Sequence, residues 1–170
     1  MAAAILGSRL ADAGVAATVA SAGTLGWGGR PATAHAVAVM EEMGLDLSSH
    51  RSRRIDAADL DVDLVLAMTR DHAGAVIGRD ESLRSSVFLP SELARVLAGA
   101  GPDEVTSAAV RIRMLGEQRE GSLIGRAAEE VADPAGEPID VYRRTARRLD
   151  RELRIIATAL VAYGRDPRGG

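Results

Sequence analysis

Asp133 begins an Asp-Pro pair directly before a long Arg-rich segment, and it is the candidate proton donor of this sequence. A carboxylic acid held beside a departing oxygen can supply the proton that the leaving group needs, which is worth roughly 10²–10⁴ in rate. Asp-Pro is also a common turn starter, and an acid near the start of a helix is favoured by the helix dipole. From these residues alone, Asp133 is therefore interpreted as a turn residue, and a role in chemistry needs support from the rest of the sequence.

Two side chains that often perform nucleophilic chemistry are absent. The 170 residues include no Cys, and all 21 basic residues are Arg, so there is no Lys. Thiolate catalysis, disulfides, thiolate metal sites and lysine Schiff bases are therefore excluded for this sequence. His35, His50 and His72 have no acid cluster at ligand spacing, so we expect no metal and no cofactor.

A few other polar or aromatic residues stand where a site could form. Ser21 follows a short apolar run, His50 belongs to a Ser-His pair, and Trp27 lies between glycines in a loop. A lone Trp among glycines is hard to explain as core, so contact with a substrate is a hypothesis for it. We expect Arg53 and Arg54 to be solvated charges.

The composition indicates one globular domain spanning residues 1–170. Hydrophobic residues make up 46% and charged residues 26%, and the net charge is −3. The arginines are interleaved with acids rather than gathered in one patch, so nucleic-acid binding is not indicated. No apolar run approaches the roughly 20 residues that span a bilayer, and no signal peptide is apparent, so we expect no membrane and a cytoplasmic location.

Apolar periodicity and helix-boundary residues predict an alternation of helices and strands. Helices are expected at 1–14, 32–44, 70–78, 90–97 and 138–163, and strands at 15–24, 61–68 and 86–89. Thr69 is the expected N-cap of the third helix. This alternation predicts a three-layer α/β/α domain with a short parallel sheet. We expect residues 98–125, which include a helical stretch, to be a surface insertion, and residues 164–170 to be a frayed tail.

Taken in order, several motifs resemble the low-molecular-weight protein-tyrosine phosphatases, a fold shared with arsenate reductases. They are Ser-Ala-Gly-Thr at 21–24, Ser49-His50 with Arg53, Ala67-Met68-Thr69, and Asp133-Pro134, and the resemblance extends over nearly the whole chain. It implies a phosphorylated protein substrate, Asp133 as the general acid and Trp27 at the rim of the substrate cleft. It also implies that Ser21 and His50 support a Cys-x5-Arg phosphate loop.

The sequence departs from this family in what it lacks. "MAAAIL" stands where the family's helix follows its phosphate loop, so the Cys loop and the preceding central strand are missing. Either Met1 is an internal start of a longer product, or the chain is a loop-less pseudoenzyme. Without that strand, the strands near Val19 and Val65 either pair directly or keep exposed edges. Ala135 and Gly136 also replace the aromatic residues that follow Asp-Pro in the family, which does not favour an aryl phosphate.

These observations lead to hypotheses from different functional classes. The first is a phosphate monoester hydrolase of the tyrosine-phosphatase type, of which this chain is a truncated and catalytically incompetent copy. The alternative is a pseudophosphatase that binds a protein partner through Trp27 and Asp133. The arsenate reductase branch also requires thiols, and an unrelated flavodoxin-like binder is a further alternative. The oligomeric state is not predicted.

Overall fold

The computed structural model describes residues 1–24, 28–56, 60–100, 107–119, 121 and 124–164. The α-helices of this part are α1 (Ala2–Asp12), α2 (Ala34–Glu42), α3 (Arg70–Ile77), α4 (Pro90–Gly99), α5 (Ala108–Glu117) and α6 (Ile139–Gly164). The strands are β1 (Val65–Leu66) and β2 (Val87–Phe88). One 3-10 helix, η2 (Glu81–Ser85), lies between the two strands in the chain, and another, η3 (Ala127–Glu129), precedes α6. The predicted helices are present, and η2 and η3 were not predicted.

Side-chain caps and proline explain where several of these helices begin. Thr33 accepts a hydrogen bond from the Ala36 N–H at 3.2 Å at the start of α2. Thr69 caps α3 in the same way, with its Oγ1 3.2 Å from the His72 nitrogen, so the predicted N-cap is confirmed. Pro90 opens α4, where its missing N–H costs no helical hydrogen bond.

The sheet is short and parallel, as predicted. Val65 pairs with Val87 and Leu66 pairs with Phe88. The Val65 N–H donates to the carbonyl of Ser86, just before β2, at 3.0 Å, and the Ala67 N–H donates to the Phe88 carbonyl at 2.9 Å. Because side chains alternate along a strand, Leu66 and Phe88 contact one hydrophobic cluster, while Val65 and Val87 contact another. Helices therefore cover both faces, which confirms the α/β/α class.

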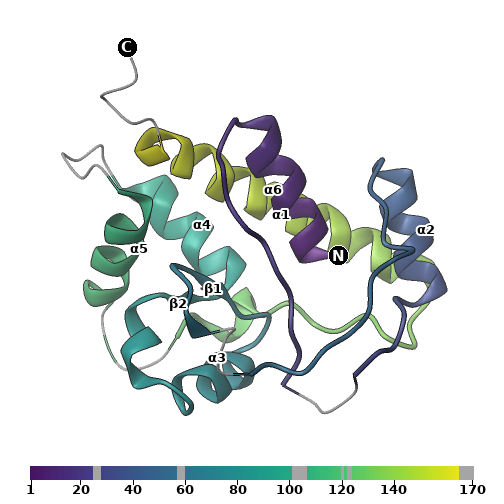
Figure 1. Ribbon diagram of the computed structural model, residues 1–170, viewed down its shortest axis with the longest axis horizontal. Coiled ribbons are helices and arrows are strands. Elements are labelled where there is room, and N and C mark those ends of the chain that lie inside the picture. Colours follow the sequence, from purple (N-terminus) through teal and green to yellow (C-terminus); the bar gives the residue numbers. More distant parts are fainter. Residues whose placement is uncertain (25–27, 57–59, 101–106, 120, 122–123, 165–170) are drawn as a thin grey trace.

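Helix α6 organises the larger of these clusters. It crosses the molecule and packs against α1, α2 and α4, which lie along its length (Figure 1). Leu153 and Ile156 on α6 are fully buried. The smaller cluster lies between the other sheet face and α3. Within the described part of the chain, no helix is long and apolar enough to span a membrane.

The outer edge of β2 is occupied by side chains. The carbonyl of Val87 accepts a hydrogen bond from Arg119 Nη2 at 2.8 Å, and the N–H of Leu89 donates to Glu92 Oε2 at 3.1 Å. Arg119 and Glu92 also form an ion pair of 2.8 Å in which Glu92 is almost completely buried. The Arg119 guanidinium stacks 4.5 Å above the Phe88 ring. One pair of charged side chains thus satisfies backbone groups that a neighbouring strand would otherwise bind.

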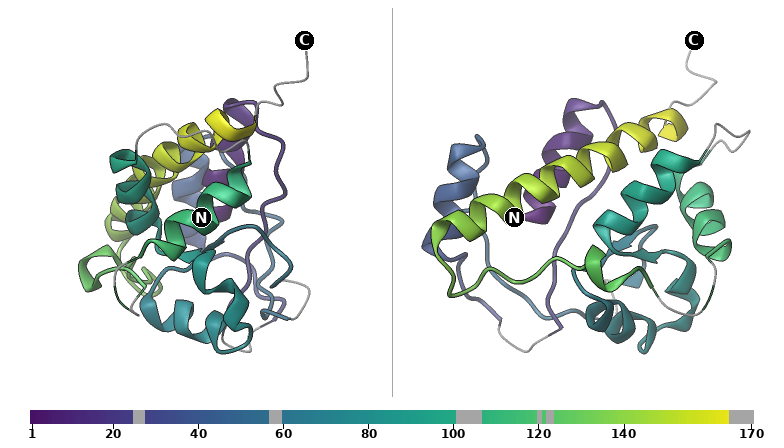
Figure 2. Two further views of the ribbon diagram at one scale, coloured as in Figure 1. Left: turned by 90° about the vertical axis from the view of Figure 1, so that its left-hand side faces the viewer. Right: turned by 180° about the vertical axis from the view of Figure 1, so that it is seen from behind.

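The chain that follows α1 differs from the prediction. Residues 15–24 are extended, as a strand would be, but pairing is limited to an isolated parallel bridge between Gly23 and Arg54. This segment runs alone from one end of α1 toward the opposite side of the molecule in each view (Figure 2). Among the described residues β1 pairs with β2 alone, so the two predicted strands near Val19 and Val65 do not pair with each other. An extended segment without a hydrogen-bonded neighbour is not a sheet strand.

Helix α5 shows that residues 98–125 are not confined to the surface. Its side chains Ile112 and Leu115 are buried in the larger cluster. Gly116 lies against the Ser85 backbone so closely that a Cβ atom would overlap it. That this segment is an insertion remains a prediction. The expected fraying of the tail concerns residues 165–170, which lie outside the described part.

Candidate functional site

Asp133 lies in an exposed turn between η3 and α6. Its Oδ1 atom accepts a hydrogen bond from the Ala135 N–H at 3.0 Å, and the Glu137 N–H donates to the Pro134 carbonyl at 3.0 Å. Gly136 completes the turn with a φ of 85°, a left-handed conformation that glycine adopts readily. The turn role is confirmed. The other carboxylate oxygen of Asp133 has no hydrogen-bond partner among the described residues, and the residue is exposed.

The residues just before Asp133 are fastened to the carboxyl end of β1. The Val131 N–H donates to the Met68 carbonyl at 2.8 Å. Glu130 Oε1 accepts hydrogen bonds from both the backbone N and the Nε of Arg70, at 3.1 and 3.0 Å. These bonds lower the pKa of Glu130, so the carboxylate is ionised at neutral pH. The Asp133 turn therefore follows an anchor at the strand end where ligands bind in parallel α/β sheets.

Arg148 on α6 holds the same segment from the other side. Its Nη1 donates to the Glu130 carbonyl at 2.7 Å, and its Nη2 donates to the Glu129 carbonyl at 2.9 Å. Nη2 also lies 2.8 Å from Ser91 Oγ at the start of α4. Nε binds Glu152 Oε1 at 2.9 Å, which balances the charge of Arg148. Helices α4 and α6 thus share the support of residues 129–131.

Ser21 and His50 lie on neighbouring segments. The bridges Gly23–Arg54 and Pro31–Arg51 hold the chain after Ser21 beside the chain after His50. Within the described residues no hydrogen bond joins Ser21 to His50, and Ser21 is exposed. Burial lowers the pKa of His50, and the positive charges of the Met1 amino group and Arg51 lower it further. His50 is therefore favoured as a neutral imidazole, and it lies within electrostatic range of the start of α1.

The other candidate residues contribute less to this region. Trp27 lies outside the described residues. His35 packs edge-on against Tyr142 with ring centroids 5.4 Å apart, which is ordinary packing between α2 and α6. His72 is half-buried in the first turn of α3. No group of three potential metal ligands occurs in the part of the chain that is described.

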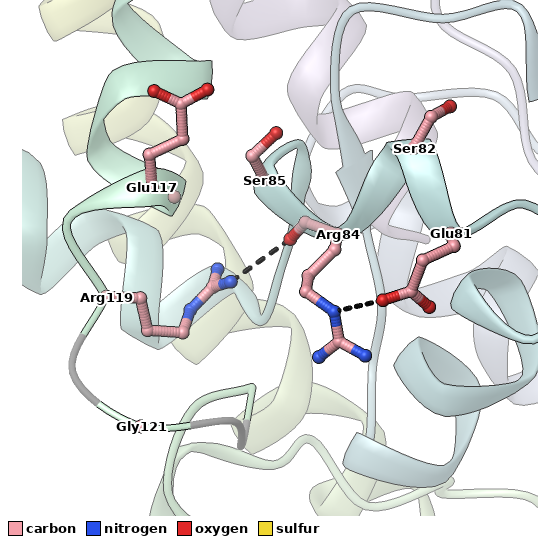
Figure 3. Close-up of a pocket in the computed structure, with 8 residues that line it drawn as sticks. Glu81, Ser82, Arg84, Ser85, Glu117, Arg119 and Gly121 are labelled. Atoms are coloured by element: carbon pink, nitrogen blue, oxygen red, sulfur yellow. Dashed lines mark hydrogen bonds and ion pairs between the residues drawn. The ribbon is translucent and has the colours of Figure 1, made fainter.

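An open cavity of about 380 Å³ lies elsewhere, between η2 and the end of α5 (Figure 3). The side chains of Arg84 and Arg119 face it, but both have partners. Arg84 Nε binds Glu81 Oε1 at 2.6 Å, and Arg119 Nη1 donates to the Arg84 carbonyl at 3.1 Å. None of the lining residues is a candidate named from the sequence. This cavity therefore does not belong to the region around Asp133.

The residues that support the Asp133 turn were not found from the sequence. Glu130 is an ordinary acid in an acidic stretch, and Arg148 is one of several arginines on α6. The sequence holds one weak indication of the role of Arg148. Arg148 and Glu152 are four residues apart on the helix, but the base precedes the acid, which is the less stabilising order for a helical ion pair. Their role became visible only when the fold brought η3, α4 and α6 together.

Comparison with known proteins agrees with this architecture. The family model described as "Low molecular weight phosphotyrosine protein phosphatase" matches residues 1–95. No curated protein sequence matches the chain. Several solved structures do, over most of their own length and over nearly all of this chain.

Three of these structures are informative. A YwlE arginine phosphatase mutant, a Cys-to-Ser variant with a phosphorylated active-site serine, is 28% identical, with a TM-score of 0.68 over 94% of this chain and 85% of that chain. YwlE arginine phosphatase from Geobacillus stearothermophilus is 26% identical, with a TM-score of 0.64 over 92% and 80%. A low molecular weight protein tyrosine phosphatase from T. tengcongensis is 25% identical, with a TM-score of 0.66 over 91% and 86%.

The family match covers residues 1–95, which are more than half of the chain, and the structural matches cover 91–94% of it. The resemblance inferred from the sequence motifs is thereby confirmed. The chain belongs to the low molecular weight phosphotyrosine protein phosphatase family.

Proposed function

We propose that this chain forms the scaffold and the general-acid half of a phosphate monoester hydrolase that acts on phosphorylated proteins, and that these 170 residues do not turn over substrate by themselves. One observation carries the proposal: the turn with Asp133 follows an anchor at the carboxyl end of β1 in a chain that has no Cys. The proposal gives Asp133 the role of the acid, and the chain contains no thiol that could be the nucleophile.

In the complete reaction a thiolate attacks phosphorus, so that an S–P bond forms while the P–O bond to the leaving group breaks. The departing oxygen takes its proton from Asp133, which must be protonated and within hydrogen-bond reach of that oxygen. The phosphorylated active-site serine of the YwlE mutant supports a covalent route in that relative. Ser21 is not offered as a substitute nucleophile, because no base contacts it among the described residues.

The open edge of β1 supports the addition of a strand there. In a parallel ladder the backbone groups of alternate residues face opposite sides, and Val65 and Ala67 face β2. The N–H and C=O of Leu66 therefore face away from β2. A strand paired at this edge and ending in a Cys-x5-Arg loop would place that loop at the same end of the sheet as the anchor of Asp133.

The substrate class has two candidates. The family description names phosphotyrosine, whereas two of the matched structures are arginine phosphatases. Ala135 and Gly136 follow Asp133-Pro134, so these positions offer no aromatic wall for a phenyl ring. This absence does not favour a phenyl leaving group. Phosphoarginine is the other candidate; there the bond that breaks is P–N, so Asp133 would give its proton to the departing guanidino nitrogen instead of to an oxygen.

The test compares the 170-residue chain with a joined chain that carries a strand and a Cys-x5-Arg loop directly before Met1. With p-nitrophenyl phosphate we expect no hydrolysis by the first and hydrolysis by the second. The joined chain with Ser in place of the loop Cys is the matched control and should be inactive. Turnover by the 170-residue chain that disappears in Asp133→Ala would refute the proposed incapacity.

A second candidate function is a pseudophosphatase that binds phosphoproteins without hydrolysing them, and the lack of Cys favours it equally. The two candidates are separated by a binding measurement on the 170-residue chain. Binding of a phosphopeptide, but not of its unphosphorylated form, with weakening in Trp27→Ala would favour the binding module. If the chain binds the two peptides equally well, the result favours the first proposal, in which the chain is the scaffold of a hydrolase.

A further inference from the structure

The Asp133 turn has few attachments of its own. Its backbone hydrogen bonds in the described chain, such as that from the Glu137 N–H to the Pro134 carbonyl, are local to the turn. The attachments to the rest of the fold lie upstream, at residues 129–131, where Arg148, Arg70 and Met68 supply the partners. From Glu130 to Asp133 an extended chain reaches about 10 Å at most. The position of Glu130 therefore limits where the carboxylate of Asp133 can lie.

Arg148 contributes the part of this anchor that fixes the backbone. It binds two successive carbonyl oxygens with different nitrogens of one planar guanidinium, which restrains both the position and the rotation of the peptide. Glu152 and Ser91 hold the guanidinium itself, through bonds of 2.9 and 2.8 Å. The Arg148 side chain is only 31% exposed, so solvent competes weakly for these donors.

The charge of Arg148 is already compensated by Glu152, so this arginine is not arranged as a receptor for phosphate. Its donors are directed to carbonyl oxygens and to side chains of α4 and α6. We propose that Arg148 is a positioning residue that, together with Ser91, sets the reach of Asp133 toward the leaving-group oxygen. The inference rests on the proposed function, because it gives Arg148 a role only if Asp133 is the general acid.

Positioning matters here because the tolerance of proton transfer is narrow. The acid must lie about 2.6–3.2 Å from the oxygen that it protonates. A misplacement of about 1 Å can cost on the order of 100-fold in rate. Such a loss should appear where the leaving group needs the proton and should be small where it does not.

The first experiment measures amide hydrogen exchange in the 170-residue chain. In Arg148→Ala we expect the Val131 amide to exchange at least about tenfold faster, with amides of α1 and α2 unchanged. Arg148→Lys, which cannot bind two carbonyls with a planar fork, should give an intermediate value. Arg154→Ala is the matched control, since Arg154 lies on the same helix, is 63% exposed and pairs with Asp150 alone in the described chain. Equal exchange in the Arg148 and Arg154 variants would overturn the inference.

The second experiment uses the joined chain and two substrates, phenyl phosphate and p-nitrophenyl phosphate. Phenolate is the poorer leaving group and depends more on the acid. We expect Arg148→Ala to lower kcat for phenyl phosphate by about 10- to 100-fold, and for p-nitrophenyl phosphate by less than about threefold. A merely structural role would lower both rates together, and that result would also overturn the inference.

Asp133→Asn in the same joined chain distinguishes failure of this inference from failure of the proposed function. If Asp133→Asn shows the leaving-group difference and Arg148→Ala does not, the positioning role is wrong and the acid role stands. If neither shows it, the acid role is wrong. Should Arg148→Ala not fold, Ser91→Ala removes one support of the guanidinium and is expected to give a weaker form of the same difference.

Discussion

Two irregular segments of this protein are held in opposite ways. Residues 128–131 have almost no regular structure beyond η3, yet α3, α4, α6 and the end of β1 all supply hydrogen-bond partners or their supports. Residues 16–22 have no regular secondary structure, and within the described chain none of their backbone groups takes part in a backbone–backbone hydrogen bond. Val15 and Val19 contact the larger core cluster, while most of their neighbours are exposed.

The difference shows that a segment without regular secondary structure is held in place where neighbouring elements supply hydrogen-bond partners for it. In the first segment the guanidinium groups of Arg148 and Arg70 donate to carbonyl and carboxylate oxygens, so these bonds are charge-assisted. The second segment has strand-forming residues but no strand beside it. β-propensity describes how well side chains fit a paired sheet, and it does not supply the pairing.

The largest effect is expected from a substitution in the larger hydrophobic cluster, which supports both segments. Leu153 on α6 is fully buried in the larger cluster. Leu153→Ala should lower the free energy of unfolding by about 2–5 kcal/mol, because it removes buried methyl groups and leaves a cavity. Ile155→Ala, at a side chain that is 43% exposed on the same helix, is the control and should change it far less. Chemical denaturation measures both, and equal losses would contradict the assignment of the core.

Amide exchange in the unmodified chain sharpens the comparison directly. The Val131 N–H donates to the Met68 carbonyl and the residue is buried, whereas the N–H groups of residues 16–22 donate to no backbone carbonyl of the described chain. We expect exchange at Val131 to be at least about tenfold slower than the average over residues 16–22, after correction for sequence effects. Comparable protection of the two segments would show that residues 16–22 are paired in solution.

A smaller effect is expected in the Asp133 turn. Gly136→Ala places a Cβ on a residue with a φ of 85°, although nothing crowds it. The variant should be less stable by about 1 kcal/mol, because side chains disfavour this backbone conformation. Gly7→Ala in α1, where the φ is ordinary and the space is open, should instead raise stability by about 0.5–1 kcal/mol. Thermal unfolding distinguishes the two signs.

The weakest expected effect is the pH dependence of stability, in which Glu129 of the first segment and His50, outside both segments, act in different pH intervals. The folded-state pKa of His50 is below its ordinary value of 6.5, so the unfolded chain takes up the proton first and stability falls as pH drops through 6.5. Burial raises the pKa of Glu129, but hydrogen bonds from Arg95 and the Arg126 N–H outweigh it, so the net shift is downward from 4.5. Its contribution is present above pH 4.5 and is lost below it.

The measurement is the free energy of unfolding between pH 7 and pH 3. His50→Gln should flatten the dependence just below pH 6.5, and Glu129→Gln should flatten it below pH 4.5. A variant that changed the other interval instead would contradict these assignments.

Local signals predicted much of the fold. Apolar spacing located α6, Thr69 and Pro90 marked helix starts, and short apolar runs located β1 and β2. The segment at 15–24 was predicted as a strand because its residues favour one. Whether a strand forms also depends on a neighbour, which the residues of the segment cannot show.

The candidate site was predicted less completely. Asp133 and His50 could be named because Asp-Pro and Ser-His stand at motif positions. Arg148 and Glu130 could not, because their partners are backbone oxygens and a backbone N–H from distant parts of the chain. Backbone groups are the same in nearly every residue, so the sequence cannot show which of them a side chain binds.

The Arg119–Glu92 pair at the outer edge of β2 has a consequence for assembly. Exposed strand edges are where sheets of separate molecules join and where aggregation starts. Here the Val87 carbonyl and the Leu89 N–H are already bonded to a buried ion pair, so an incoming strand would have to separate two charges away from water before it could pair. Growth of this sheet is thereby directed to the β1 side.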